Sequence, residues 1–242
     1  DTPKARLAQV HSAQVIVPAP SASTGARAIY MECELDISRA FGVSAKDDGP
    51  PSVFCVTDEM LRHPKWGQGL KDVLDKMGER SRRAQGLSKA VTYGGGMVLG
   101  SCKVYLLAAK HQGLGLLKIG PKRLYIAKGA DEGLVEINPL CVLDFYVVEG
   151  HQRGGLGFTL FRRMLSSEGV APAKLAYDRP SPKLIGFLRK HFSLARYTPQ
   201  SNHFVVFDAY WSSGALRSGG STASGGSGGV SARRSRSSVG FE

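Results

Sequence analysis

The sequence predicts a layered α/β domain, and three observations lead to that prediction. Apolar residues recur at helical spacing in several segments, and short apolar runs ending in Gly-containing turns lie between them. Along the chain these segments follow the order helix, several strands, helix, strand, helix, strand. That order is typical of an α/β layer rather than of a helical bundle or a β-sandwich.

The first half of the domain contains one predicted helix and most of the predicted strands. Residues 64–84 form the helix, after a loop at 47–52 marked by turn residues. Strands at 98–107, 114–119 and 124–127 are expected to form an antiparallel meander, and a long strand is expected at 135–148. The helix is indicated by apolar residues at spacings of three and four: Trp66, Leu70, Val73, Leu74 and Met77.

The second half alternates helices with short strands. A helix is expected at 155–165, a short strand at 174–177, a second helix at 182–191 and a final strand at 203–210. Ser181 is expected to be the N-cap of the second helix, with Pro182 at its first position. The apolar stripe of the first helix consists of Leu156, Leu160, Phe161, Met164 and Leu165.

Composition divides the 242 residues into three parts. Residues 31–211 are expected to form one domain, preceded by a flexible N-terminal extension at 1–30. Residues 212–242 are mostly Ser, Gly, Ala and Arg, so we expect a disordered basic tail, because such a segment cannot bury enough apolar surface to offset its ordering entropy. The alternative for the tail is a tether to an anionic surface.

The net charge and the cysteine spacing indicate which partners and which cellular compartment to expect. The formal net charge is +12, from 32 Lys and Arg against 20 Asp and Glu, which favours an acidic partner. No apolar run approaches the roughly 20 residues needed to span a bilayer, so a soluble protein is expected. The four cysteines lack the spacing of a metal site or of a disulfide framework, so no metal is predicted and a reducing, intracellular compartment is expected.

The most informative segment is a glycine loop between the long strand and the following helix, with the sequence Gln152-Arg153-Gly154-Gly155-Leu156-Gly157. Glycines there let backbone N–H groups turn toward one point, and the helix N-terminus adds partial positive charge, so the loop can hold an anion. A plain structural turn is the alternative. A dinucleotide site is disfavoured, because the GxGxxG pattern and a preceding βα unit are absent.

Several motifs together resemble the α-tubulin N-acetyltransferase family, a divergent branch of the GCN5-related N-acetyltransferase (GNAT) fold. They are the glycine loop, the runs 141–147, 178–184 and 199–207, and the GxxSxxAQxL pattern of Gly78, Ser81, Ala84, Gln85 and Leu87. The resemblance covers about residues 31–211. It implies a mixed, mostly antiparallel sheet flanked by helices, and acetyl-CoA as the co-substrate.

The resemblance also implies where acetyl-CoA binds. The segment 145–158 would line the channel, and Lys183 and Lys190 would meet the ribose phosphate or, alternatively, form the solvated face of a helix. The implied binding residues are Phe145, Tyr146, Val147, Val148, Gln152, Arg153, Gly154, Gly155, Leu156, Gly157, Phe158, Ser181, Lys183 and Lys190.

Acetyl transfer to lysine needs a general base, because only about one lysine side chain in 2,500 is deprotonated at pH 7. The resemblance implies Asp178 as the base or amine-orienting group; the alternative is a cap of the helix that follows. Cys141 is given a supporting role, with a nucleophile, a proton relay or a buried apolar residue as alternatives. Gln85 is implied at the rim of the active site, or is simply a polar residue at a helix end.

By resemblance, the predicted reaction is direct attack, in a ternary complex, by a lysine of α-tubulin that lies on a loop facing the microtubule lumen. The alternatives are acetylation of another protein such as histones, or an inactive microtubule-binding protein. Basic clusters at Arg80, Arg82, Arg83 and at Lys118, Lys122, Arg123 suit an acidic surface, but no nucleic-acid-binding motif accompanies them. A monomer is expected, in the cytoplasm and on the microtubule cytoskeleton, including the axoneme of a cilium or flagellum.

Overall fold

The computed structural model describes residues 31–43, 49–95, 101–129 and 133–212. The chain divides into a compact unit, 1–212, and a second unit, 213–242. The predicted N-terminal extension and the tail beyond Ser212 therefore lie outside the described residues.

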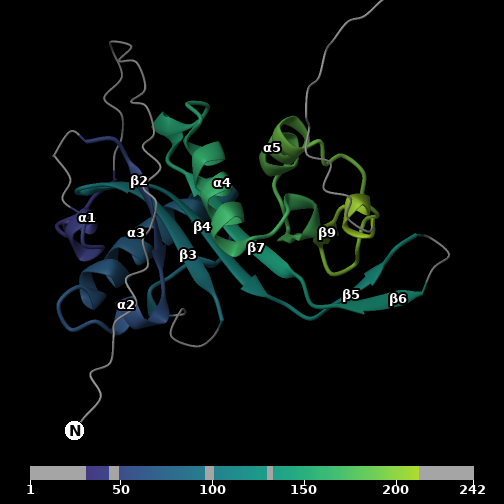
Figure 1. Ribbon diagram of the computed structural model, residues 1–242, viewed down its shortest axis with the longest axis horizontal. Helices are drawn as coiled ribbons and strands as arrows, with labels where there is room; N and C mark the ends of the chain where they lie inside the picture. Colours follow the sequence, from purple (N-terminus) through teal and green to yellow (C-terminus); the bar gives the residue numbers. More distant parts are fainter. Residues whose placement is uncertain (1–30, 44–48, 96–100, 130–132, 213–242) are drawn as a thin grey trace, which may run out of the picture. The chain divides into compact units, whose positions relative to one another are not determined.

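A large sheet forms the centre of the compact unit, with the strand order β2-β3-β4-β7-β8-β9 and with β1 paired to β4 (Figure 1). Among the described strands of this sheet, only β7 and β8 pair in parallel, and the other pairings are antiparallel. This confirms the mixed, mostly antiparallel sheet. The strands are β1 (Met31–Glu32), β2 (Ser52–Val56), β3 (Lys103–Ala109), β4 (Gln112–Pro121), β7 (Leu140–Val147), β8 (Ala176–Asp178) and β9 (Phe204–Val206).

Successive side chains of a strand point to opposite faces of the sheet and pack into two hydrophobic cores, one on each face. In β3, Val104 and Leu106 join the core that includes α3, whereas Tyr105 and Leu107 join the core that includes α4 and α5. The helices are α1 (Ile37–Ala40), α2 (Asp58–Arg62), α3 (Gly67–Gln85), α4 (Leu156–Glu168) and α5 (Pro182–Phe192). Helices thus flank the sheet on both sides, as predicted.

The prediction of a three-strand meander and of one long strand at 135–148 was wrong. β5 (Leu124–Ala127) does not join β4 but pairs with β6 (Leu134–Ile137) in a separate two-stranded sheet, which Figure 1 shows running away from the large one. The expected long strand is interrupted at Asn138 and Pro139, where β6 ends and β7 begins. Proline has no N–H to donate to a ladder, so the two halves pair with different strands.

Other differences concern element boundaries. The predicted helices at 64–84, 155–165 and 182–191 appear as α3, α4 and α5 with small shifts. The strand expected at 174–177 begins two residues later, because Pro172–Lys174 forms a 3-10 helix. The final strand ends at Val206 and is followed by a 3-10 helix, Asp208–Tyr210. Sequence reasoning missed β1, α1, β2 and α2, and it placed Ser52, the first residue of β2, in a loop. Residues 98–100 of the expected first strand lie outside the described residues.

In the described part of the chain, no helix is both long and apolar enough to cross a bilayer. The same residues contain no group of three or more His, Cys, Asp or Glu side chains arranged to hold a metal ion.

Candidate active site

The parallel pairing of β7 and β8 is short, and a pocket lies where the two strands separate. The register joins Cys141 to Ala176 and Val142 to Tyr177, and it ends there. The pocket brings together predicted residues from four segments of the chain. It is lined by Gln85, Val142, Leu143, Asp144, Phe145, Asp178, Arg179, Pro180, Ser181 and Leu184.

Asp178 is the last residue of β8 and is one of the residues that line this pocket. The alternative that it caps the next helix is wrong, because the Ser181 hydroxyl accepts a hydrogen bond from the Leu184 N–H at the start of α5. Asp178 instead accepts from Nε of Arg179 at 3.2 Å. Its side chain is 19% exposed and that of Arg179 is 67% exposed, so the carboxylate is sheltered while its partner faces solvent.

Cys141 lies beneath the pocket rather than in its lining. It is fully buried in a small core with Ala176 and Val206, and its thiol donates to the Pro139 carbonyl at 3.5 Å. Burial, reinforced by the negative charge of Asp178, raises the pKa of the Cys141 thiol to about 12. The thiol is therefore protonated at neutral pH, which argues against a nucleophilic role.

Gln85 ends α3, as predicted, and reaches the pocket rim through a hydrogen-bond network around Asp144. Gln85 Nε2 donates to the Ser81 hydroxyl at 2.7 Å and to Asp144 Oδ1 at 2.9 Å. Ser81 donates to the same oxygen at 2.8 Å, and the Thr92 hydroxyl donates to Asp144 Oδ2 at 2.7 Å. The carboxylate therefore ties together α3, β7 and the segment that follows α3.

The glycine loop leads into α4 with an unusual backbone. Arg153 and Gly155 both have positive φ, at 67° and 83°, and Gly155 is the N-cap of the helix. Among the described residues, no partner accepts a hydrogen bond from the N–H groups of Leu156, Gly157 or Phe158. A Cβ on Gly155 would meet nothing within 4 Å. The loop thus presents donors to open space, as an anion site requires.

The remaining predicted binding residues occupy different surroundings. Phe145 lines the pocket and packs against Phe161 and Phe187, while Tyr146 points to the other face of the sheet. Phe158 stacks on His191 of α5 at 4.7 Å between ring centroids. Val147 and Val148 are buried in opposite cores, Gln152 donates to the Val147 carbonyl, and Lys183 and Lys190 are exposed.

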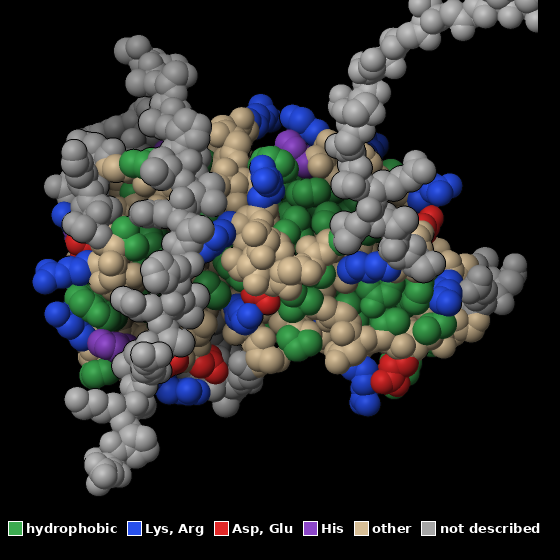
Figure 2. Space-filling model, in the orientation of Figure 1, with side chains coloured by type: hydrophobic (Ala, Val, Ile, Leu, Met, Phe, Trp, Pro, Cys, Tyr) green, Lys and Arg blue, Asp and Glu red, His purple; other side chains and the backbone are tan. Residues whose placement is uncertain are grey.

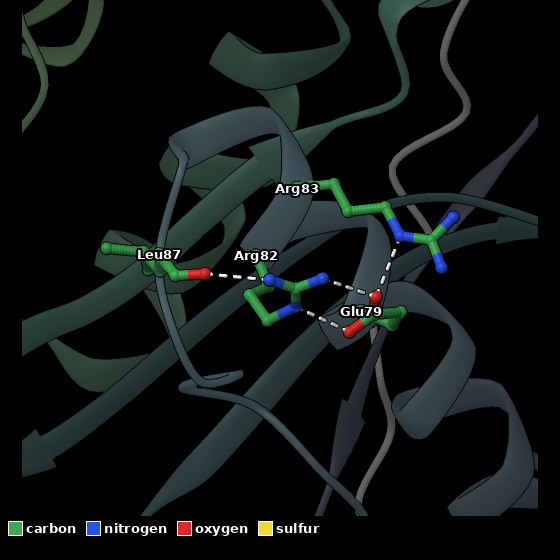
Figure 3. Close-up of polar contacts among 4 residues, drawn as sticks. All are labelled: Glu79, Arg82, Arg83 and Leu87. Carbon is green, nitrogen blue, oxygen red and sulfur yellow. Dashed lines mark hydrogen bonds and ion pairs between the residues drawn. The ribbon is translucent and has the colours of Figure 1, made fainter.

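The predicted basic clusters are only partly available to an acidic partner. Lys118 is buried and donates to the Val91 carbonyl at 2.7 Å, so its assignment to a surface cluster was wrong. Arg82 and Arg83 both hydrogen-bond to Glu79 (Figure 3), and these bonds lower the pKa of Glu79 to about 2. On the face seen in Figure 2, Lys and Arg side chains are spread out rather than gathered into one patch.

Comparison with known proteins identifies the fold family. The family model described as "GNAT acetyltransferase, Mec-17" matches residues 52–233. The chain belongs to the Mec-17 family of GNAT acetyltransferases. This confirms the family that the glycine loop and the α3 motif resemble.

Several curated relatives of this Mec-17 family chain carry the name alpha-tubulin N-acetyltransferase. The protein from Leishmania infantum is 49% identical over 140 residues, which is 57% of this chain and 57% of that protein. The Tetrahymena thermophila protein is 49% identical over 61% of this chain and 37% of its own length. The Phytophthora infestans protein is 56% identical over 41% of this chain and 55% of its own. The matches thus span roughly a third to three-fifths of these relatives.

Sequence reasoning missed Asp144 and Thr92 as members of the site. One signal for Asp144 was available, since it is the only charged residue in the apolar run 140–148 and charged residues are seldom fully buried without partners. Thr92 lies in a segment with no such signal. Arg179, which pairs with Asp178, was likewise not singled out.

Proposed function

We propose that this chain transfers the acetyl group of acetyl-CoA to the ε-amino group of a lysine of α-tubulin. The observation that carries the proposal is the pocket at the separation of β7 and β8, where Asp178 and Gln85 face one space in a chain of the Mec-17 family. The names of the relatives support the substrate.

Acetyl-CoA would be held along β7 and the glycine loop. The N–H groups at the start of α4 and the positive-φ residues Arg153 and Gly155 would receive its pyrophosphate. Phe145 and Phe158 would line the channel, with Ser181, Lys183 and Lys190 on the side of the adenosine. A Cβ on Gly155 would meet no atom within 4 Å, so the backbone of the loop is open to a ligand at this point.

The carboxylate of Asp178 would take the proton of the lysine ammonium, directly or through a water molecule. The neutral amine nitrogen then forms a bond to the thioester carbonyl carbon and the C–S bond breaks. The nitrogen gives up its second proton to the departing CoA thiolate, so the products are the neutral amide and the CoA thiol, and Asp178 later releases the first proton to solvent. We place the chemistry in a ternary complex rather than through an acetyl-cysteine, because the thiol of Cys141 is buried and its pKa is raised to about 12.

The finer assignments follow from the same proposal. The acceptor lysine would lie on the luminal loop of α-tubulin, and the protein would act as a monomer, in the cytoplasm and on the microtubule cytoskeleton, including that of a cilium or flagellum. The domain would extend over residues 31–211, between a flexible extension and a disordered tail.

The test is transfer of labelled acetyl from acetyl-CoA to assembled microtubules, with histones offered in parallel and an Asp178→Asn variant as the control. Label on α-tubulin from the wild type alone supports the proposal. Label on histones instead would contradict the tubulin assignment. Binding of acetyl-CoA without any transfer would favour an inactive microtubule-binding protein.

A further inference from the structure

Asp144 is a buried carboxylate with three side-chain donors and no role in the reaction as described so far. The residue is 5% exposed. Ser81 and Gln85 donate to Oδ1, and Thr92 donates to Oδ2. Lys118 lies opposite it in the β4–β7 register, where burial lowers the pKa of the lysine and the charge of Asp144 opposes that effect. Removing a buried charge from water is costly, so these partners are needed to hold it.

This network fixes which way the amide of Gln85 faces. A carboxylate only accepts hydrogen bonds, so the group within 2.9 Å of Asp144 Oδ1 must be the NH₂ of Gln85 and not its carbonyl oxygen. Both hydrogen bonds of this side chain run through Nε2, and Oε1 makes none to any described residue. Gln85 itself is exposed and lines the pocket.

Two acceptor side chains of the pocket lining suit an incoming ammonium. One is Gln85, through Oε1, and the other is Asp178, whose Oδ1 is already bonded to Arg179. The acceptor oxygens of Asp144 and Ser181, which also line the pocket, already accept hydrogen bonds from within the protein. An ammonium carries three N–H donors and no acceptor, so it suits such a pair. While Asp178 takes one proton, the amide oxygen can hold a second N–H and thereby direct the lone pair of the amine.

We propose that Asp144 is a positioning residue for the acceptor lysine, which it orients by holding the amide of Gln85 with its NH₂ inward and its carbonyl oxygen toward the pocket. The inference rests on the proposed function, because it supplies a second hydrogen-bond acceptor, Oε1 of Gln85, for the lysine amine of that reaction. Asp144 acts through Gln85 and touches no reacting atom.

Two packing features hold together the segments that carry the network. A Cβ on Gly78 would lie 1.8 Å from the Thr92 carbonyl oxygen, so only glycine lets the segment carrying Thr92 approach α3 this closely. Arg82 donates through Nη1 to the Leu87 carbonyl and through Nε and Nη2 to Glu79, which fastens the last turn of α3 to the chain that follows it (Figure 3). Gln85 lies in that same turn.

The test exchanges the two side chains. In Gln85→Glu, two carboxylates face each other, and kcat/KM for the lysine substrate should fall about 100-fold, since a misplaced contact can cost that much. In Asp144→Asn the orientation of the amide is no longer fixed by charge, and a loss of about tenfold is expected. The double variant restores one amide and one carboxylate, so its kcat/KM should recover to within about tenfold of wild type.

Controls separate positioning from folding. Glu168→Gln alters another sheltered carboxylate, bonded to Lys103 and Tyr105 and outside the pocket lining, so it should lower the Tm without changing kcat/KM. The dissociation constant of acetyl-CoA should stay near wild type in every variant. If the losses of kcat/KM in the two single variants multiply in the double variant, instead of compensating, the inference is wrong. If the wild type transfers no acetyl to α-tubulin, the proposed function fails first.

Discussion

Replacing Asp178 by Asn tests the proposed base with little disturbance of the fold. The new amide oxygen can still accept from Arg179 Nε, and Ser181 keeps the cap of α5. Because the arginine of the Asp178–Arg179 pair is 67% exposed, loss of that charge pair should cost at most about 1 kcal/mol of stability. The fold should therefore survive while the base is lost.

The expected loss of turnover follows from the acid–base chemistry of lysine. With a free pKa near 10.4, about one amine in 2,500 is neutral at pH 7, and a general base typically contributes 10²- to 10⁴-fold. We expect kcat at pH 7 to fall about 10³-fold. Since the variant depends on the free amine, its kcat should rise about tenfold per pH unit between pH 6 and 9, more steeply than that of the wild type.

The assay is steady-state transfer to microtubules across that pH range, with the affinity for acetyl-CoA measured by calorimetry. Unchanged affinity with the steep pH profile would support the role of Asp178 as base. Parallel losses of affinity and turnover would mean that the carboxylate supports the pocket structurally, and a rate equal to wild type would remove it from the chemistry.

Three further predictions follow from the same site. Gly155→Trp should abolish acetyl-CoA binding, because the indole fills the open space beside the loop; equal affinity in a titration would take the loop out of the site. Cys141→Ala should keep turnover within about tenfold of wild type, and intact mass after mixing with acetyl-CoA alone should reveal no acetylated enzyme, whereas a stable acetyl adduct on wild type would contradict direct attack. Gly78→Ala should lower stability by about 1–3 kcal/mol, because the Thr92 segment must move, and should reduce turnover more than acetyl-CoA affinity; a chemical unfolding curve like that of wild type would contradict the packing argument.

Local patterns in the sequence predicted much of the fold. Helical spacing located α3, α4 and α5, and the Ser181-Pro182 pair located a cap that the structure confirms. The partner of each strand was harder to predict, since pairing depends on residues far apart in sequence. β5 looks the same in sequence whether it continues the large sheet or pairs with β6.

The same distinction holds for the candidate site: residues in local motifs could be predicted, and contacts between distant residues could not. Motif positions predicted Asp178, Gln85 and the glycine loop, because each belongs to a pattern of residues that lie close together in the sequence. The network of Asp144 joins residues separated by 52 to 63 positions, and no local pattern marks such contacts. Lys118 shows the opposite error, because a lysine beside other basic residues looks solvated until its strand is placed at the centre of the sheet.

The short pairing of β7 with β8 has a consequence for local unfolding. β8 pairs with β7 at two positions, Ala176 with Cys141 and Tyr177 with Val142, whereas β3 and β4 pair along almost their full length. Backbone amides of β8 and β9 should therefore exchange with solvent through openings of lower free energy than amides of β3 and β4. A ligand that binds between β7 and β8 stabilises the closed state. At a ligand concentration of 100 times its dissociation constant, the free energy of these local openings would rise by about 2.7 kcal/mol. Hydrogen exchange of the amides of β8 and β9 would then slow about 100-fold. The strand that carries Asp178 would therefore become more ordered when the pocket is occupied.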